Sequence, residues 1–268
     1  MKRRFQFALV ATISTIALTQ IVSAADLPRK APAAAPPPAP VYTWTGCYIG
    51  GNVGAAWSRQ TGDFAAVPAV IQLPGTIAQN DSSGIGGVHL GCNYQFDPRF
   101  VVGVEGDWSW TGLNGSGSAP NFFAGPPAFV EPTGGINMSS DTKWMASLRA
   151  RLGWVVMPQT MIYATGGAAW AKTDYTGFDA ATTNNGFTTV SFSNTKSGWV
   201  VGGGAEYMLT PNWLVRAEYL YYQFSGANAL GNNATPGFNN SPTGLFATFN
   251  WNDLRVNEVR AGISYKFF

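Results

Sequence analysis

Charged side chains recur at every second position within otherwise apolar stretches, and they are the groups through which this chain could do chemistry. Nine of them, five acids and four bases, are predicted to share one interior: Glu105, Asp107, Arg149, Arg151, Glu206, Arg216, Glu218, Glu258 and Arg260. An isolated buried charge costs several kcal/mol or more, so charges in a narrow interior must pair. We therefore expect residues 105–107 to face 149–151, and residues 216–218 to face 206 and 258–260.

Three roles remain open for this charge set: a structural network that fills the interior, a narrow ion path, or a gate that exchanges ion-pair partners. The structural role is favoured, because the chain has eight alternating segments, and the interior of an eight-stranded barrel is only just wide enough for its own side chains. Inward glycines such as Gly50, Gly54, Gly202 and Gly204 would leave room for long arginine side chains.

The remaining polar residues predict no catalytic, metal or cofactor site. The one histidine, His89, falls on an inner face, where it offers no accessible pairing with a serine or an acid. No cluster of histidine, cysteine and aspartate has the spacing of metal ligands. The glycine pairs lie within strand patterns that no helix follows, so they are not phosphate loops.

Cys47 and Cys92 are the only cysteines, and they are expected on neighbouring strands. An oxidising envelope would permit a cross-strand disulfide. Such bridges have demanding geometry, and the sequence does not give the register. Two free thiols that act as small apolar residues fit the sequence equally well.

The segment from Phe100 to Trp110, FVVGVEGDWSW, shows how the charges are positioned. Alternate residues from Phe100 to Trp110 are mostly apolar, whereas Glu105 and Asp107 lie on the opposite face. The two end aromatics are ten residues apart. At about 3.3 Å per residue and a tilt near 40°, this is roughly 25 Å, the height of the apolar band on a membrane barrel. We interpret the aromatic face as outward, in lipid, and the acidic face as inward.

Similar aromatic positions recur along the chain. Outward aromatics are predicted to form girdles at the two edges of the apolar band: Trp57, Trp108, Trp110, Trp144, Trp154, Trp170, Trp199, Tyr207, Trp213 and Tyr265. Residues 160–174 are apolar on both faces, and there Ile162, Ala164, Ala168 and Trp170 are placed outside. Alternation places Lys143 inside.

Eight alternating segments are recognisable, at about 45–57, 83–96, 100–110, 142–156, 160–174, 197–209, 213–225 and 253–268. Short connections near 97–99, 157–159 and 210–212 alternate with long ones near 59–82, 113–141, 176–196 and 227–252. This pattern is typical of outer-membrane barrels. The sequence predicts an all-β fold, an eight-stranded antiparallel up-and-down transmembrane β-barrel with a side-chain-filled lumen, short periplasmic turns and four long external loops. Phenylalanines in the long segments either mark a binding surface or pack in strand extensions above the membrane.

The composition also favours a membrane barrel. Of the 268 residues, 14% are aromatic and only 11% are charged, well below the usual quarter for soluble domains. Beyond the N-terminus, no run approaches the 18 or more apolar residues of a membrane helix. Without the three basic residues at the start, 13 basic residues face 14 acidic ones, which gives no charge argument for nucleic acid.

The N-terminal region is predicted to be separate from the barrel. Residues 1–25 are interpreted as a signal peptide, because Lys2, Arg3 and Arg4 precede an apolar run that ends in small residues. Residues 26–43 are rich in proline and alanine, a composition that favours extended polyproline II, and are interpreted as a periplasmic spacer. Residues 44–268 form the predicted barrel.

The order of these features resembles the opacity-like immunogenic outer-membrane barrels of rhizobial-type bacteria, within the broader OmpA-type group of small barrels. The resemblance rests on ADLP after the signal, the proline-rich spacer, YTWTGCYIGGNVGAAW at 42–57, YATGG at 163–167 and the terminal RAGISYKFF. It implies that the barrel-insertion machinery recognises the last strand through Tyr265, Phe267 and Phe268. Two departures are the cysteines, where such barrels usually carry other apolar residues, and the doubled terminal phenylalanine. Proteins of this group are often labelled porins, a label that nothing in this sequence supports by itself.

We therefore expect a structural outer-membrane protein for envelope integrity and surface display, and not an enzyme. A small porin that passes ions or small solutes is one alternative, and a surface adhesin that acts through the external loops is another. The expected partners are outer-membrane lipid, the barrel-insertion machinery during assembly, and host or envelope surface molecules at the loops; no nucleic acid is expected.

Overall fold

The computed structural model describes residues 42–67, 75–125, 129–181, 186–234 and 246–267. The predicted signal peptide, nearly all of the predicted spacer and Phe268 lie outside these residues. The strands are β1 (Gly46–Val67), β2 (Gly75–Asp97), β3 (Phe100–Gly125), β4 (Phe129–Met157), β5 (Thr160–Ala181), β6 (Gly186–Met208), β7 (Trp213–Phe224), β8 (Ala227–Ala234), β9 (Phe246–Trp251) and β10 (Leu254–Phe267). No described segment is a helix long and apolar enough to cross a membrane.

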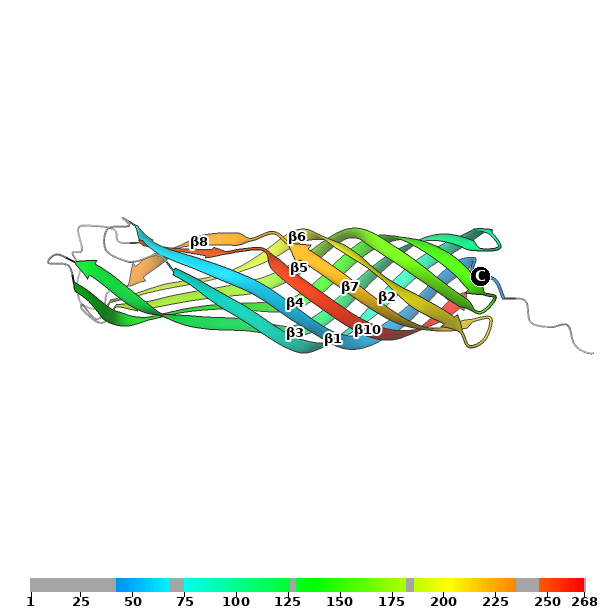
Figure 1. Cartoon of the computed structure of the whole chain (residues 1–268), viewed down its shortest axis with the longest axis horizontal. Coiled ribbons are helices and arrows are strands. Elements are labelled where there is room, and N and C mark those ends of the chain that lie inside the picture. The colour runs from blue at the N-terminus through cyan, green and yellow to red at the C-terminus, as the bar shows by residue number, and fades with distance from the viewer. Residues whose placement is uncertain (1–41, 68–74, 126–128, 182–185, 235–245, 268) are drawn as a thin grey trace, which may run out of the picture. The chain divides into compact units, whose positions relative to one another are not determined.

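The strands form one closed antiparallel ring (Figure 1). From β1 to β6 each strand pairs with its sequence neighbour; β6 then pairs with β7, β7 with β10, and β10 with β1. The closing pair runs from Cys47 opposite Phe267 to Arg59 opposite Arg255. A closed ring leaves no unpaired strand edge, which is the condition under which a sheet can cross a bilayer.

Two strand paths of the ring are each built from two pieces. Both β7 and β8 pair with β6, so β8 continues the path of β7 beyond residues 225–226. Both β9 and β10 pair with β1, so β9 precedes β10 in one path that is interrupted at 252–253. The ring therefore has the eight strand paths that the sequence predicts.

The prediction of four long external loops needs correction, because strands occupy most of those segments. The pairing of β1 with β2 continues from Arg59 and Asn80 to Phe64 and Gly75. β4 already begins at Phe129 and β6 at Gly186. The sequence hid these extensions because strand formation depends on neighbouring strands and packing more than on intrinsic preference.

The girdled half of the barrel, the strand segments between the two aromatic girdles, has the predicted facing. All ten predicted girdle aromatics point outward; nine are exposed and Trp144 is half-buried. Trp144 stacks on Trp108 with ring centroids 4.2 Å apart, which covers part of its surface. The outward placement of Ile162 and Trp170 on β5 is confirmed.

Lys143 on β4 is the exception to the predicted facing, because its side chain points outward. The register with β5 shifts between Thr142 and Trp144, so one additional residue stands in β4. Such a bulge changes which face the following residues occupy. Lys143 is exposed and its Nζ lies 2.5 Å from Asp141, whose hydrogen bond raises the pKa of Lys143. Alternation alone does not reveal a bulge, and therefore gave the wrong face.

The distal half of the barrel, the strand extensions beyond Trp57 and Trp199, has the opposite polarity. Its interior is a buried apolar cluster of Phe64, Ile77, Ile136, Met138, Tyr175, Phe249 and Trp251. Along β6 in this half, Thr189, Ser191 and Ser193 are exposed on the outer face. Phe192 and Phe249 pack inside, as expected for strand extensions, whereas Phe178 on β5 is 36% exposed.

Candidate functional site: the charged lumen

The charged lumen lies inside the girdled half, where β3, β4, β6, β7 and β10 each contribute inward side chains. Glu105 on β3 is its centre and is 1% exposed. Its carboxylate lies 2.5 Å from a guanidinium nitrogen of Arg149, 2.6 Å from Arg216 and 3.3 Å from Arg151. Arg216 reaches Glu105 across the lumen, because β3 and β7 are not neighbours in the ring.

A second group of ion pairs surrounds Arg260 on β10. Its guanidinium lies 2.7 Å from Glu218, 3.2 Å from Glu258 and 3.3 Å from Asp107. Arg149 joins the two groups, since it also donates to Glu218 at 2.8 Å.

The remaining acid, Glu206, pairs with Arg151 at 2.6 Å. All nine charged residues predicted for the lumen are thus buried and within ion-pair distance of at least one partner. The neighbouring-strand pairs follow the predicted grouping: Glu105 is opposite Arg149, Glu206 opposite Arg216, and Glu218 opposite Arg260. The contacts across the lumen were not predicted, because strand register gives neighbours and not the far wall.

Neutral side chains complete the network, and little in their residue pattern indicated this role. The Tyr48 hydroxyl donates to Glu105 at 2.6 Å and accepts a hydrogen bond from Arg151. Ser147 donates to Asp107. The guanidinium of Arg151 also stacks over the ring of Tyr163, 3.9 Å from its centroid. Only the inward register of these residues on their strands could have identified them.

Gly54 on β1 has a specific packing role. A Cβ atom at this position would collide with the backbone of Val259 and Arg260 on β10. The glycine therefore allows β1 and β10 to approach closely at the level of Arg260.

His89 is buried inside the lumen and pairs there with a serine, a contact that the sequence did not predict. Its Nε2 lies 2.7 Å from Ser264 Oγ, and its Nδ1 lies 3.4 Å from Asn52. It is 2% exposed. No group of three or more potential metal ligands occurs within the described ranges.

Apolar layers lie on both sides of the charges. Toward the short-turn end, the interior is closed by Trp44, Val101, Met161, Tyr163, Met208 and Leu214. Toward the distal half, a layer that includes Leu113, Met145, Tyr222 and Phe224 covers the network. The arrangement can therefore fill and fix the girdled half of the barrel, with each of the nine predicted lumen charges in at least one ion pair.

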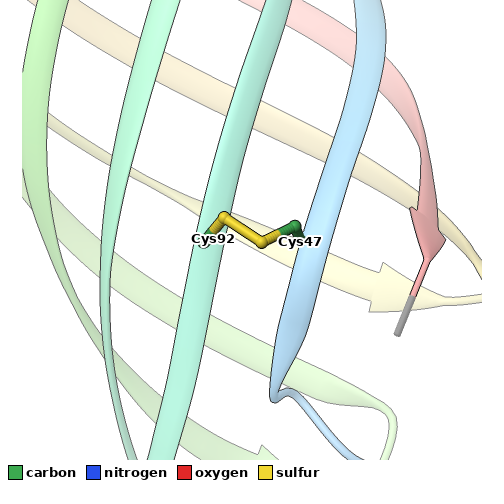
Figure 2. The surroundings of a disulfide bond; sticks show 2 residues. All are labelled: Cys47 and Cys92. Atoms are coloured by element: carbon green, nitrogen blue, oxygen red, sulfur yellow. A yellow bond between two sulfur atoms is a disulfide. The ribbon is translucent and has the colours of Figure 1, made fainter.

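The outer face of the girdled half carries a disulfide between Cys47 and Cys92 (Figure 2). The two residues are opposite each other on β1 and β2, with Cα atoms 3.9 Å apart. Of the two outcomes that the sequence left open, the structure has the bonded one.

The comparisons with known proteins agree with this architecture. A model of the outer membrane protein beta-barrel domain matches residues 30–267. The chain belongs to this family. The resemblance noted from the sequence is thereby confirmed, and the chain is an outer-membrane protein.

Curated relatives of this outer-membrane barrel are named immunogenic proteins. The 31 kDa outer-membrane immunogenic protein of Brucella melitensis is 32% identical over 265 residues, which cover 97% of this chain and 98% of the relative. The 25 kDa outer-membrane immunogenic protein of Brucella canis is 32% identical over 262 residues, covering 92% and 96%. These names describe outer-membrane antigens and no enzymatic reaction.

Solved structures give more distant matches. The outer-membrane protease OmpT of Escherichia coli is 10% identical with a TM-score of 0.48, covering 84% of this chain and 98% of that protein. OprG of Pseudomonas aeruginosa is 13% identical with a TM-score of 0.43, covering 85% and 99%. At these scores neither structure bears on what this barrel does.

Proposed function

We propose that this outer-membrane barrel is a structural protein, closed to solutes, that contributes to envelope integrity and displays a protein surface outside the cell. The observation that carries the proposal is the filled lumen. Nine charged residues with 0–8% exposure are paired within it, and apolar layers lie on both sides of them.

A conducting path would have to interrupt these contacts. An ion that enters the charged layer would separate pairs such as Arg149–Glu218, and separated charges in a buried site are costly. The same ion would then meet the layer that contains Trp44 and Met161. This favours a structural role over the porin alternative, and also over a gate that exchanges ion-pair partners.

Planar-bilayer conductance tests the closed lumen directly. Wild-type protein should give no steady ion-scale channels. Steady channels that Arg149→Ala abolishes or resizes would place transport in this lumen and overturn the proposal. Lys143→Ala is the control, because that side chain lies outside the barrel and should leave any conductance unchanged.

Surface display follows from the distal half, whose outer face is polar in the strand extensions. A Ser193→Cys variant should react with a membrane-impermeant maleimide on intact cells. A Gln159→Cys variant, in the short turn between β4 and β5, should react only after the envelope is broken. Labelling of Gln159→Cys and not Ser193→Cys in intact cells would reverse the assigned orientation.

Envelope integrity is tested in cells that lack the protein. Such cells should become more sensitive to detergents, and the wild-type chain should restore resistance. If the wild-type chain, present at its normal level in the outer membrane, does not restore resistance, the integrity role is excluded.

Two partners belong to the same proposal. Lipid would cover the apolar face of the girdled half, which includes exposed side chains such as Val53, Leu90 and Leu148. The barrel-insertion machinery would recognise the end of β10, where Tyr265 is exposed and Phe267 half-buried; Phe268 lies outside the described residues. Host or envelope molecules are candidate partners at the distal end.

The buried position of His89 favours no enzymatic role for this barrel.

A further inference from the structure

Two arginines stand directly opposite each other on the outer face of the barrel. Arg59 on β1 and Arg255 on β10 are register partners, and both are exposed. Like charges in directly opposite positions on neighbouring strands destabilise a sheet. An anion bound between the two guanidiniums would relieve this repulsion.

Two acids near the pair, Asp253 and Asp81, accept hydrogen bonds from neutral donors and form no ion pair with either arginine. Among the described residues, neither arginine forms an ion pair with a carboxylate. The carboxylate of Asp253 accepts hydrogen bonds from Gly226 and Gln223, at 3.1 and 3.0 Å. The carboxylate of Asp81 accepts one from the backbone of Asn114 at 2.6 Å.

Amide side chains flank the arginine pair on the two neighbouring strands. Asn80 on β2 is opposite Arg59, and Gln223 on β7 is opposite Arg255. The four residues therefore form a row across four adjacent strands, β2, β1, β10 and β7, at one level. Two hollows adjoin it, of about 780 and 640 Å³. Arg59 lines both and Arg255 lines the smaller one; each also has one carboxylate in its wall, that of Asp81 in the larger and that of Asp253 in the smaller.

The row lies at the level of the lipid headgroups. Trp57, an outer-girdle residue that is 46% exposed, precedes Arg59 by two positions on the same face of β1. Two residues of a strand rise about 6.6 Å, so the guanidiniums stand just above the apolar band. Arginine side chains at such interfaces keep their charge in the headgroup layer, and their planar fork binds phosphate oxygens in pairs.

We propose that Arg59 and Arg255 form a binding site for the phosphate of an outer-leaflet lipid. The two hollows accept the headgroup, Asn80 and Gln223 flank it, and the acyl chains lie on the apolar face below Trp57. The site is separate from the charged lumen and does not depend on whether the lumen conducts.

The test uses the folded protein in a zwitterionic detergent, with retained lipid counted by native mass spectrometry. Phosphatidic acid should be retained in preference to phosphatidylcholine. The double variant Arg59→Gln/Arg255→Gln should weaken phosphatidic acid retention about tenfold or more, because two charge-assisted contacts are lost. Unchanged retention in this variant would overturn the proposal.

The matched control removes the same charge elsewhere. In Arg99→Gln/Lys172→Gln, one cation is taken from a short turn and one from the outer face of β5, two positions beyond Trp170. This variant should retain phosphatidic acid almost as the wild type does. If it loses as much phosphatidic acid as Arg59→Gln/Arg255→Gln, the effect comes from net charge and the proposed site is wrong. Both variants must keep the gel mobility shift on boiling that marks a folded barrel.

A last arm separates the lipid from the free anion. Inorganic phosphate, at matched ionic strength, should not displace bound phosphatidic acid at concentrations similar to those of the lipid. If inorganic phosphate displaces phosphatidic acid at those concentrations, the site binds free phosphate and the assignment to a lipid is wrong.

Discussion

The girdled and distal halves of this barrel share the same strands and have opposite polarity. β6 runs through both, and its even-numbered residues from Lys196 to Met208 form the inward register of that stretch, with Phe192 inward in the distal half. Its outer face changes from serine and threonine to apolar residues between Ser197 and Trp199. Its inner face changes from Phe192 in an apolar cluster to Glu206 in the charged lumen.

The difference shows that the surrounding medium decides which face is apolar. In the distal half the outside is water, so stability must come from apolar side chains buried within. In the girdled half the apolar face is already solvated by hydrocarbon, and the interior is free to hold polar groups if they are paired. Alternation in a sequence therefore shows which residues share a face of the strand. Whether the inner face is apolar or polar depends on the level of the residues relative to the membrane.

The largest effect should come from breaking the charged lumen. Arg149→Met removes the shared partner of Glu105, Asp107 and Glu218. We expect a loss of about 3–5 kcal/mol in the free energy of unfolding, because buried carboxylates lose their counter-charge. Urea unfolding in detergent, followed by tryptophan fluorescence, measures it.

Lys143→Met is the matched control, since that lysine forms its ion pairs on the exposed outer face. It should leave the free energy of unfolding almost unchanged. Equal effects of the two substitutions would mean that the lumen charges are not buried pairs.

A charge on the outer face should distinguish the two halves. Leu148→Arg places a cation on the lipid face of the girdled half and should cost about 2–4 kcal/mol near the bilayer midplane. Ser193→Arg makes the same cation in the distal half and should change stability by less than about 0.5 kcal/mol. Unfolding of both variants in lipid vesicles gives the comparison, and similar costs would contradict the assigned membrane level.

A smaller, pH-dependent effect is expected at Lys196, inside the distal half close to the boundary. Burial lowers the pKa of Lys196 to about 8, and its Nζ lies over the ring of Tyr175, 4.6 Å from the centroid. Between pH 8 and the unfolded value near 10.5 the unfolded chain binds the additional proton, so stability should rise with pH. The rise should reach at most about 3 kcal/mol.

Lys196→Met should remove this rise, whereas Lys172→Met, on the outer face, should retain it. Unfolding curves at several pH values between 7 and 10.5 measure the slope. A wild-type slope that persists in Lys196→Met would assign the proton to another group.

The sequence by itself determined the alternation, and with it the strand paths, the outward girdle and the inward set from Glu105 to Arg260. These are properties of residue order, because successive side chains of a strand face opposite sides. Turn signals such as Asp97-Pro98 then separated the paths.

Tertiary structure decided what depends on the far wall or on register. The contact from Arg216 to Glu105 required the ring to close, and the disulfide required Cys47 and Cys92 to be opposite each other. The outward turn of Lys143 required a bulge that alternation does not reveal. The strand extensions formed where polar outer faces could be solvated while rings such as Phe249 packed within. The physical reason is the same in each case. Local spacing determines the direction in which a side chain points, but only the assembled ring determines which residues it contacts.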